Sequence, residues 1–203
     1  MRVGILGGSF NPPHLGHLAL ARTALESGLV DRVCLIPAAT PPHKVVSGHV
    51  DAAKRSAMAH LLAGEDDRLS VDDIELRRSG PSYTIDTLHE LRAANPGVSY
   101  RIIIGSDLAK TFATWRSYRE ILEIAPPLVA ERPDDVFHGD ADYAGMTPDE
   151  IQVMKKGRFE MEPVDISSTM IRRLVSEGAP DASLLLFLTG PVLSYVRDNR
   201  LYL

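Results

Sequence analysis

Two histidines stand three residues apart, directly after a glycine-rich turn near the start of the chain. Residues 7–17 read Gly-Gly-Ser-Phe-Asn-Pro-Pro-His-Leu-Gly-His, with the histidines at positions 14 and 17. Residues three apart share one face of a helix, so both rings would project from the same first turn. The unpaired N–H groups and the dipole of such a turn attract anions. Two imidazoles can also donate hydrogen bonds to phosphoryl oxygens that gain charge in a transition state. The pattern therefore favours a phosphate-binding site.

The glycines of this segment fit the same interpretation. Gly7 and Gly8 bring no side chain between the backbone and a ligand, and Gly16 is expected to leave space for a phosphate. Their spacing matches neither the P-loop nor the dinucleotide-binding glycine pattern. Zinc binding by the histidines is disfavoured because no third ligand cluster stands nearby. Plain helix-capping histidines remain the ordinary alternative for this pair taken alone.

A second anion-binding pattern lies near the other end of the chain. Residues 166–172 read Ile-Ser-Ser-Thr-Met-Ile-Arg. Ser167 or Ser168 would cap a helix whose first N–H groups face an anion, and Arg172, one turn in, can reach back with its guanidinium. A serine cap before an amphipathic helix is common, so a purely structural role is the alternative here.

Strand-like and helix-like segments alternate along the chain, which predicts an α/β fold of Rossmann-like, doubly wound type. We expect a mostly parallel sheet with helices on both faces. In such a sheet ligands bind beyond the carboxyl ends of the strands, which selects the loops at 7–17, 37–44 and 105–115. The predicted strands are 3–6, 33–36, 69–76, 100–104, 128–130 and 159–164. The predicted helices are 14–27, 52–62, 84–94, one opened by a capping box at Thr147, 168–175 and 191–198.

The bulk properties narrow the class of protein. The 203 residues predict a single domain over 1–203 with a short helical portion at about 167–203. With a net charge of −5, the protein lacks the excess of basic residues that duplex-binding modules carry, so no nucleic-acid partner is expected. No segment approaches the ~20 apolar residues of a membrane span, and we expect a cytoplasmic protein with no membrane partner. Cys34, the only cysteine, reads as a small buried hydrophobe. The polar stretch 134–145 could form a subunit contact, so assembly into a homo-oligomer is compatible with the sequence.

The two anion-binding patterns together resemble one family. The segment up to His17 resembles the H-x-G-H signature of the nucleotidyltransferase superfamily, and Gly-Gly-Ser-Phe-Asn-Pro before it is similar to the form found in bacterial nicotinate-nucleotide adenylyltransferases. Residues 166–172 resemble that family's Ile-Ser-Ser-Thr-x-x-Arg motif. The resemblance runs from Gly7 to Arg172 and leaves 134–160 unmatched. It implies ATP-binding residues, of which His14, His17 and Arg172 are catalytic, at Gly7, Gly8, Ser9, Phe10, His14, Gly16, His17, Gly105, Asp107, Ile166, Ser167, Ser168 and Arg172.

The same resemblance implies where a mononucleotide binds. Lys44, in Pro-Pro-His-Lys, would hold its phosphate, and Thr84, also a candidate helix cap after Ser82-Tyr83, would bind a nicotinate carboxylate. Trp115 would stack on the pyridine ring, and the backbone N–H of Arg116 would be a second carboxylate donor. Taken alone, Lys44 reads as a solvated lysine and Trp115 as a core residue. The mononucleotide-binding residues that the resemblance implies are Lys44, Tyr83, Thr84, Trp115 and Arg116. Arg132 is expected to lie beside the adenine.

The implied reaction is a step of NAD biosynthesis. The 5′-phosphate of nicotinate mononucleotide attacks the α-phosphorus of ATP, giving nicotinate adenine dinucleotide and pyrophosphate. Mg²⁺ would bridge the phosphate oxygens, with no metal held by protein side chains alone. The alternatives are nicotinamide mononucleotide or phosphopantetheine as acceptor, and a non-catalytic ATP-sensing domain of the same fold.

Overall fold

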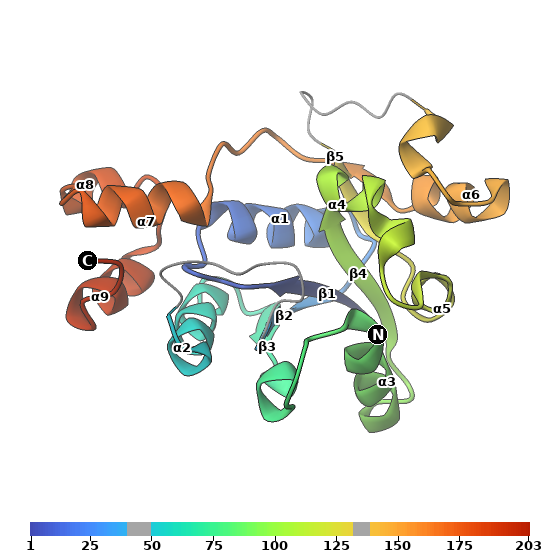
Figure 1. Ribbon diagram of the computed structural model, residues 1–203, viewed down its shortest axis with the longest axis horizontal. Coiled ribbons are helices and arrows are strands. Elements are labelled where there is room, and N and C mark those ends of the chain that lie inside the picture. Colours follow the sequence, from blue (N-terminus) through green and yellow to red (C-terminus); the bar gives the residue numbers. More distant parts are fainter. Residues whose placement is uncertain (40–49, 132–138) are drawn as a thin grey trace. The chain divides into compact units, whose positions relative to one another are not determined.

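Six strands form one sheet in the computed structural model, which describes residues 1–39, 50–131 and 139–203 (Figure 1). The strands are β1 (Arg2–Gly8), β2 (Arg32–Pro37), β3 (Leu69–Val71), β4 (Ser99–Gly105), β5 (Leu128–Glu131) and β6 (Arg158–Glu160). Their order across the sheet is β3-β2-β1-β4-β5-β6. β4 pairs in parallel with β1 and with β5, and β5 pairs in parallel with β6. The chain thus reverses its direction of winding beside β1, as a Rossmann-like fold requires, and the predicted fold class is confirmed.

Helices separate the strands along the chain. They are α1 (Leu15–Glu26), α2 (Ala52–Ala63), α3 (Thr84–Ala94), α4 (Ser106–Lys110), α5 (Tyr118–Ile124), α6 (Pro148–Lys156), α7 (Ser168–Ser176), α8 (Asp181–Leu184) and α9 (Gly190–Asp198). The described residues also form short 3-10 helices, η1 (Ile74–Arg77), η2 (Phe112–Thr114) and η3 (Asp140–Tyr143). In the described part of the chain, none of the helices has both the length and the hydropathy that a membrane crossing needs.

The described chain falls into two compact units. The first comprises Met1–Gly7, Leu20–Cys34 and Tyr83–Pro163, and the second comprises Gly8–Ala19, Leu35–Ser82 and Val164–Leu203. The core of the first unit includes the three isoleucines of β4, Ile102, Ile103 and Ile104, all buried. This continuous apolar run is typical of a parallel strand covered on both faces. Cys34 is buried as predicted.

Two predicted strands are longer than the strands observed. The prediction 69–76 ends at Val71, because Ile74–Arg77 forms η1 instead. The prediction 159–164 ends at Glu160, and Pro163, which has no N–H, could not extend the pairing. The sequence analysis also missed α4, α5 and α8, which are too short to show a helical period. The capping box of α6 is present as predicted: the Thr147 side chain accepts from Glu150 N–H, and the Glu150 side chain accepts from Thr147 N–H.

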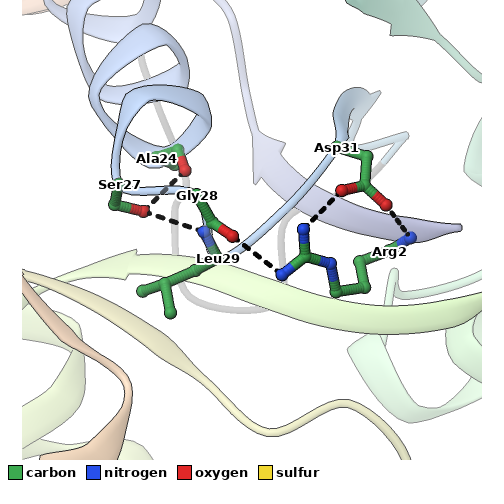
Figure 2. A network of polar contacts seen from close by, with 6 residues as sticks. All are labelled: Arg2, Ala24, Ser27, Gly28, Leu29 and Asp31. Carbon is green, nitrogen blue, oxygen red and sulfur yellow. Dashed lines mark hydrogen bonds and ion pairs between the residues drawn. The ribbon is translucent and has the colours of Figure 1, made fainter.

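The end of α1 is fixed by the network in Figure 2, which lies within the first unit. Gly28 adopts a φ of +70°, a conformation that suits glycine after a helix, so the predicted helix stop is confirmed. Ser27 Oγ donates to Ala24 O and accepts from Leu29 N–H. Arg2 then donates from its side chain to Gly28 O and to the Asp31 carboxylate, which also accepts from Arg2 N–H. These bonds tie the start of β1 to the turn that enters β2.

Candidate active site

The two histidines occupy the start of α1, within the second unit. His14 stands immediately before the helix, and its carbonyl accepts from His17 N–H at 2.9 Å. The His14 backbone N–H in turn donates to His17 Nδ1 at 3.2 Å. The His17 ring thus does at the third helical position what glutamate does in a capping box. Because Nδ1 accepts a hydrogen bond, the neutral ring carries its proton on Nε2, which makes Nε2 a hydrogen-bond donor.

Aromatic side chains of the loop that precedes α1 pack against one another. We call residues 8–17 the histidine loop. Phe10 is fully buried with a φ of +47°, an uncommon conformation for a residue with a side chain, and its ring lies 5.0 Å from the His17 ring, centroid to centroid. The rings of His14 and His17 are 3.8 Å apart. The two imidazoles and the phenyl ring therefore form one contiguous cluster.

Each of the two glycines of the histidine loop has an aromatic side chain close to the place that its Cβ atom would occupy. A Cβ atom on Gly8 would lie 3.2 Å from the Phe10 ring. A Cβ atom on Gly16 would lie 3.0 Å from His14 Nδ1, so the imidazole occupies the place that a side chain at residue 16 would take. Gly7 is an exposed residue of β1 in the first unit, and a Cβ atom there would meet no atom of the described residues within 4 Å.

The second pattern contacts the histidine loop. Ser167 caps α7 by accepting from Met170 N–H at 3.1 Å, while Ser168 Oγ donates to Pro12 O at 2.9 Å. Arg172 donates to Asn11 O at 2.9 Å. The structure thus brings together two segments whose bonded residues are 156 and 161 positions apart, as their predicted common role requires. Ile166, just before the cap, is partly exposed.

Arg55 and Tyr202 of the second unit hold the histidine loop from outside it, through Ser9 and Asn11, and none of Arg55, Tyr202 and Asn11 was among the predicted site residues. Asn11 is buried, and its Oδ1 accepts from Tyr202 OH at 2.9 Å. Arg55 of α2 is 1% exposed and donates to Ser9 O at 2.7 Å. Arg55 could have been found, because it lies on the same helical stripe as the apolar Met58, Ala59 and Leu62. Tyr202, at the second-last position of the sequence, is part of no sequence pattern that would indicate a role at the histidine loop.

In the first unit, the end of β4 carries the predicted ribose-binding residue. Gly105 ends the strand, and α4 begins at once with Ser106. Asp107 is exposed in the first turn of α4, and a Cβ atom on Gly105 would lie only 2.7 Å from Asp107 Oδ1. The carboxylate therefore folds back over the glycine, and only glycine fits there without moving it.

The first unit also brings together the predicted nicotinate-binding residues around the start of α3. The Arg116 guanidinium lies 4.7 Å from the Tyr83 ring centroid, a cation–π geometry, and 3.7 Å from the Asp86 carboxylate. Thr84 is the first residue of α3, so its prediction as helix cap is wrong: Tyr83 occupies the cap position, with no side-chain cap bond. Trp115 is partly exposed and packs on Phe112, with ring centroids 5.1 Å apart. Trp115 is therefore not an ordinary core residue.

Two predicted residues lie outside the described part of the chain. Lys44, expected to hold the mononucleotide phosphate, falls within 40–49, and Arg132, expected beside adenine, falls within 132–138.

Comparison with known proteins gives one consistent family. The model of the cytidylyltransferase-like family matches residues 5–174. A protein of Geobacter metallireducens named "Probable nicotinate-nucleotide adenylyltransferase" is 36% identical, and the alignment covers 100% of this chain and 98% of the relative. A protein of Symbiobacterium thermophilum with the same name is 36% identical, with coverages of 100% and 95%.

A solved structure shares the fold. The nicotinic acid mononucleotide adenylyltransferase of Plasmodium falciparum, complexed with NaAD, superimposes with a TM-score of 0.75 over 99% of this chain and 97% of its own. At 15% sequence identity, that likeness concerns the fold alone.

Proposed function

The chain belongs to the cytidylyltransferase-like family, and we propose that it transfers the AMP part of ATP to nicotinate mononucleotide. Relatives named nicotinate-nucleotide adenylyltransferases that align over its full length support this activity. The structural observation that carries the proposal is the joining of the two anion-binding segments in one unit, through the bonds from Ser168 and Arg172 to the histidine loop.

The proposed reaction is a single in-line displacement. An oxygen of the mononucleotide 5′-phosphate forms a bond to the α-phosphorus of ATP, and the bond from that phosphorus to the bridging oxygen breaks. The products are nicotinate adenine dinucleotide and pyrophosphate. A phosphate monoester is already an anion near neutral pH, so the attack requires no general base. Catalysis rests on alignment and on stabilisation of charge at the phosphates.

We assign these tasks to residues of the second unit. His17 donates from Nε2 to a phosphoryl oxygen, since Nδ1 is engaged by the His14 N–H. The His14 ring lies against the His17 ring, tilted by 40°, and supplies the second imidazole. Arg172 and the N-terminus of α7, capped by Ser167, bind the β- and γ-phosphates. By family resemblance, the proposed ATP-binding set also includes Gly8, Ser9, Phe10, Gly16, Ile166 and Ser168 of the second unit and Gly7, Gly105 and Asp107 of the first, with Asp107 assigned to the ribose.

Mg²⁺ enters this proposal as part of the substrate. Among the described residues, no group of three or more His, Cys, Asp and Glu side chains is arranged to hold a metal ion. We propose that Mg²⁺ binds through phosphate oxygens and water, the coordination it commonly takes with nucleotides. When bound, the ion would neutralise charge on the departing pyrophosphate.

Residues of the first unit support nicotinate as the acceptor. Thr84 offers a hydroxyl and a first-turn N–H of α3, and Trp115 offers a partly exposed indole face. N–H and hydroxyl donors suit a carboxylate, whereas the amide of nicotinamide would turn an NH₂ group toward them. We assign Tyr83 and the Arg116 backbone N–H to the same acceptor, and Lys44 to its phosphate.

The test is pyrophosphate release from MgATP with each acceptor in turn: nicotinate mononucleotide, nicotinamide mononucleotide, phosphopantetheine, and none. We expect kcat/KM for nicotinate mononucleotide to exceed that for the amide by at least ~100-fold, the scale of a mispaired polar group in a built site.

Each alternative has its own signature in this assay. Equal rates with acid and amide would contradict the carboxylate assignment, and a preference for phosphopantetheine would contradict the acceptor class. Binding of ATP without pyrophosphate release under any condition would indicate a sensing domain and overturn the proposed activity.

A further inference from the structure

The C-terminal turn of the chain reaches the histidine loop. After α9, Arg200 and Tyr202 have φ values of +48° and +65°. Residues other than glycine adopt such angles at a cost in free energy, unless other contacts hold them. Leu201 is buried, and its N–H donates to Val196 O at 2.9 Å. The turn is thereby fixed so that Tyr202 OH donates to Asn11 Oδ1 at 2.9 Å. All these residues belong to the second unit.

Burial keeps this phenol in its donor form. Desolvation raises the pKa of Tyr202 above its usual value, against a smaller opposing effect of Arg172 and Arg55. The hydroxyl is therefore protonated throughout the neutral range. Asn11, which it binds, is 1% exposed. This hydrogen bond between two side chains is partly buried and fixes the orientation of both.

Arg55 holds the same loop from α2. Its guanidinium donates to Ser9 O at 2.7 Å, to Ala39 O at 3.1 Å and to Val50 O at 3.1 Å. The carbonyl of Ser9 and the N–H of Phe10 belong to one planar trans peptide. Arg55 therefore also sets the direction of the Phe10 N–H.

The loop depends on such side-chain donors because of its own sequence. Pro12 and Pro13 have no N–H, so this stretch cannot be held by a regular backbone ladder. In the described structure Ser9, Asn11 and Pro12 carbonyls accept instead from Arg55, Arg172 and Ser168. Arg172 and Ser168 come from the segment already assigned to ATP. Arg55 and Tyr202 do not.

We infer that Tyr202 and Arg55 are positioning residues of the phosphate site, which hold the histidine loop in the geometry that presents His14 and His17. The inference rests on the proposed function for its catalytic consequence. Neither residue touches the reacting atoms: Tyr202 acts through Asn11, and Arg55 acts through the backbone at Ser9. The last turn of the chain thereby becomes a part of the catalytic unit.

The test compares Tyr202→Phe with Tyr195→Phe in the full chain. The first variant removes the hydroxyl that binds Asn11 and keeps the ring. Tyr195 is partly exposed on α9, and in the described structure its side chain makes no hydrogen bond to the histidine loop. The measurements are kcat and both KM values for pyrophosphate release, the melting temperature, and amide hydrogen exchange at Phe10 and Asn11.

We expect Tyr202→Phe to lower kcat by roughly 10- to 100-fold, the scale of a small misplacement of catalytic groups. The KM for nicotinate mononucleotide should stay within about threefold, since the acceptor residues are untouched. Exchange at Phe10 and Asn11 should become several-fold faster. Tyr195→Phe should match the wild type in all of these.

The inference is overturned if Tyr202→Phe has wild-type kcat and exchange rates. It is also overturned if the variant melts earlier but each folded molecule turns over normally, because its role is then stability alone. If the wild type releases no pyrophosphate with any acceptor, the proposed function fails, and hydrogen exchange at Phe10 and Asn11 still decides whether Tyr202 holds the loop. Arg55→Lys, which keeps the charge but cannot span three carbonyls, should reproduce the faster exchange at Phe10.

Discussion

His17 uses its two ring nitrogens for different purposes. Nδ1 accepts the His14 N–H at 3.2 Å and so caps α1, which leaves the ring proton on Nε2. A capping role and a phosphate-binding role are therefore not alternatives at this residue. The cap fixes the tautomer and the ring direction, and the proposed chemistry uses the other edge.

This division can be tested with two substitutions at one position. His17→Asn keeps an acceptor near the place of Nδ1 and loses the Nε2 donor, while His17→Ala loses both. If Nε2 is the catalytic donor, both variants should lower the single-turnover rate by at least ~100-fold, and only His17→Ala should lose cap stability of about 1 kcal/mol. Single-turnover kinetics and thermal unfolding measure the two effects. A His17→Asn rate within a few-fold of wild type contradicts the assignment.

At the scale of single residues, the sequence singled out the residues to which we assign chemistry and missed most of those that support them. His14, His17 and Arg172 are identifiable because their types and spacing suit phosphate. Asn11 and Tyr202 are not, because their contact joins positions 191 residues apart and neither type is unusual where it stands. Thr84 was misread as a cap, since threonine is a good cap residue, but the helix starts at Thr84 itself.

At the scale of elements, the first turn of α1 is shaped by packing against the histidines. Gly16 lies within this helix, where glycine is about 1 kcal/mol less favourable than alanine. The His14 ring explains its presence, because a Cβ atom there would lie 3.0 Å from Nδ1. Glycine at position 16 therefore lowers the helix propensity but leaves room for the His14 imidazole.

Gly16→Ala should therefore separate stability from activity. The change favours the helix but moves the His14 ring by a few tenths of an ångström, so we expect kcat to fall about 10-fold or more with no drop in melting temperature. The matched control is Gly190→Ala at the start of α9, where a Cβ atom meets nothing within 4 Å of the described structure. Equal kcat in wild type and Gly16→Ala would show that the ring position is not critical.

The turn between α1 and β2 makes a prediction about pH. The hydrogen bond from the Arg2 side chain, aided by the Arg2 backbone N–H, lowers the pKa of Asp31. A carboxyl with a lowered folded-state pKa adds stability above its unfolded pKa, about 3.9, and loses it as the pH falls through the folded pKa. Asp31→Asn should thus lower the melting temperature at pH 7 and make little difference near pH 2. Thermal unfolding at both pH values checks this, and a difference that persists unchanged at low pH would refute it.

Long elements were predicted well and short ones poorly, for one physical reason. β4 and α1 show their period over enough residues to be recognised. α4 has five residues and α8 has four, less than two turns, so their existence depends on packing and not on local pattern. The 3-10 helix at Ile74–Arg77 took the place of the last residues of a predicted strand, whose first residues form β3, since a short apolar stretch fits either structure.

At the scale of the whole molecule, a segment that begins at Ile166 contacts the histidine loop, and we assign both to one proposed site. The sequence suggested this only by resemblance, because no local pattern reveals which distant segments meet. The structure supplies the physical link through Ser168 Oγ to Pro12 O and Arg172 to Asn11 O. Ligand binding at such a site should stabilise the fold that assembles it.

MgATP at about 100 times its Kd should therefore raise the melting temperature by roughly 5–10 °C, from about 2.7 kcal/mol of binding free energy in a chain of this size. Arg172→Ala should lose most of this rise at the same ATP concentration, because it removes a guanidinium donor to the phosphates. The control is Arg173→Ala, an exposed neighbour on α7. An undiminished rise in Arg172→Ala would remove that residue from the ATP site.

The most direct test of the central claim follows the phosphorus atoms of ATP. The protein is incubated with Mg²⁺, nicotinate mononucleotide and ATP labelled either at the α- or at the γ-phosphate, and the products are separated. Adenylyl transfer predicts that the α label appears in a dinucleotide containing nicotinate and AMP, and that the γ label appears only in pyrophosphate. Release of ADP or orthophosphate, with the γ label transferred to the acceptor or released by hydrolysis as orthophosphate, would contradict the proposed reaction.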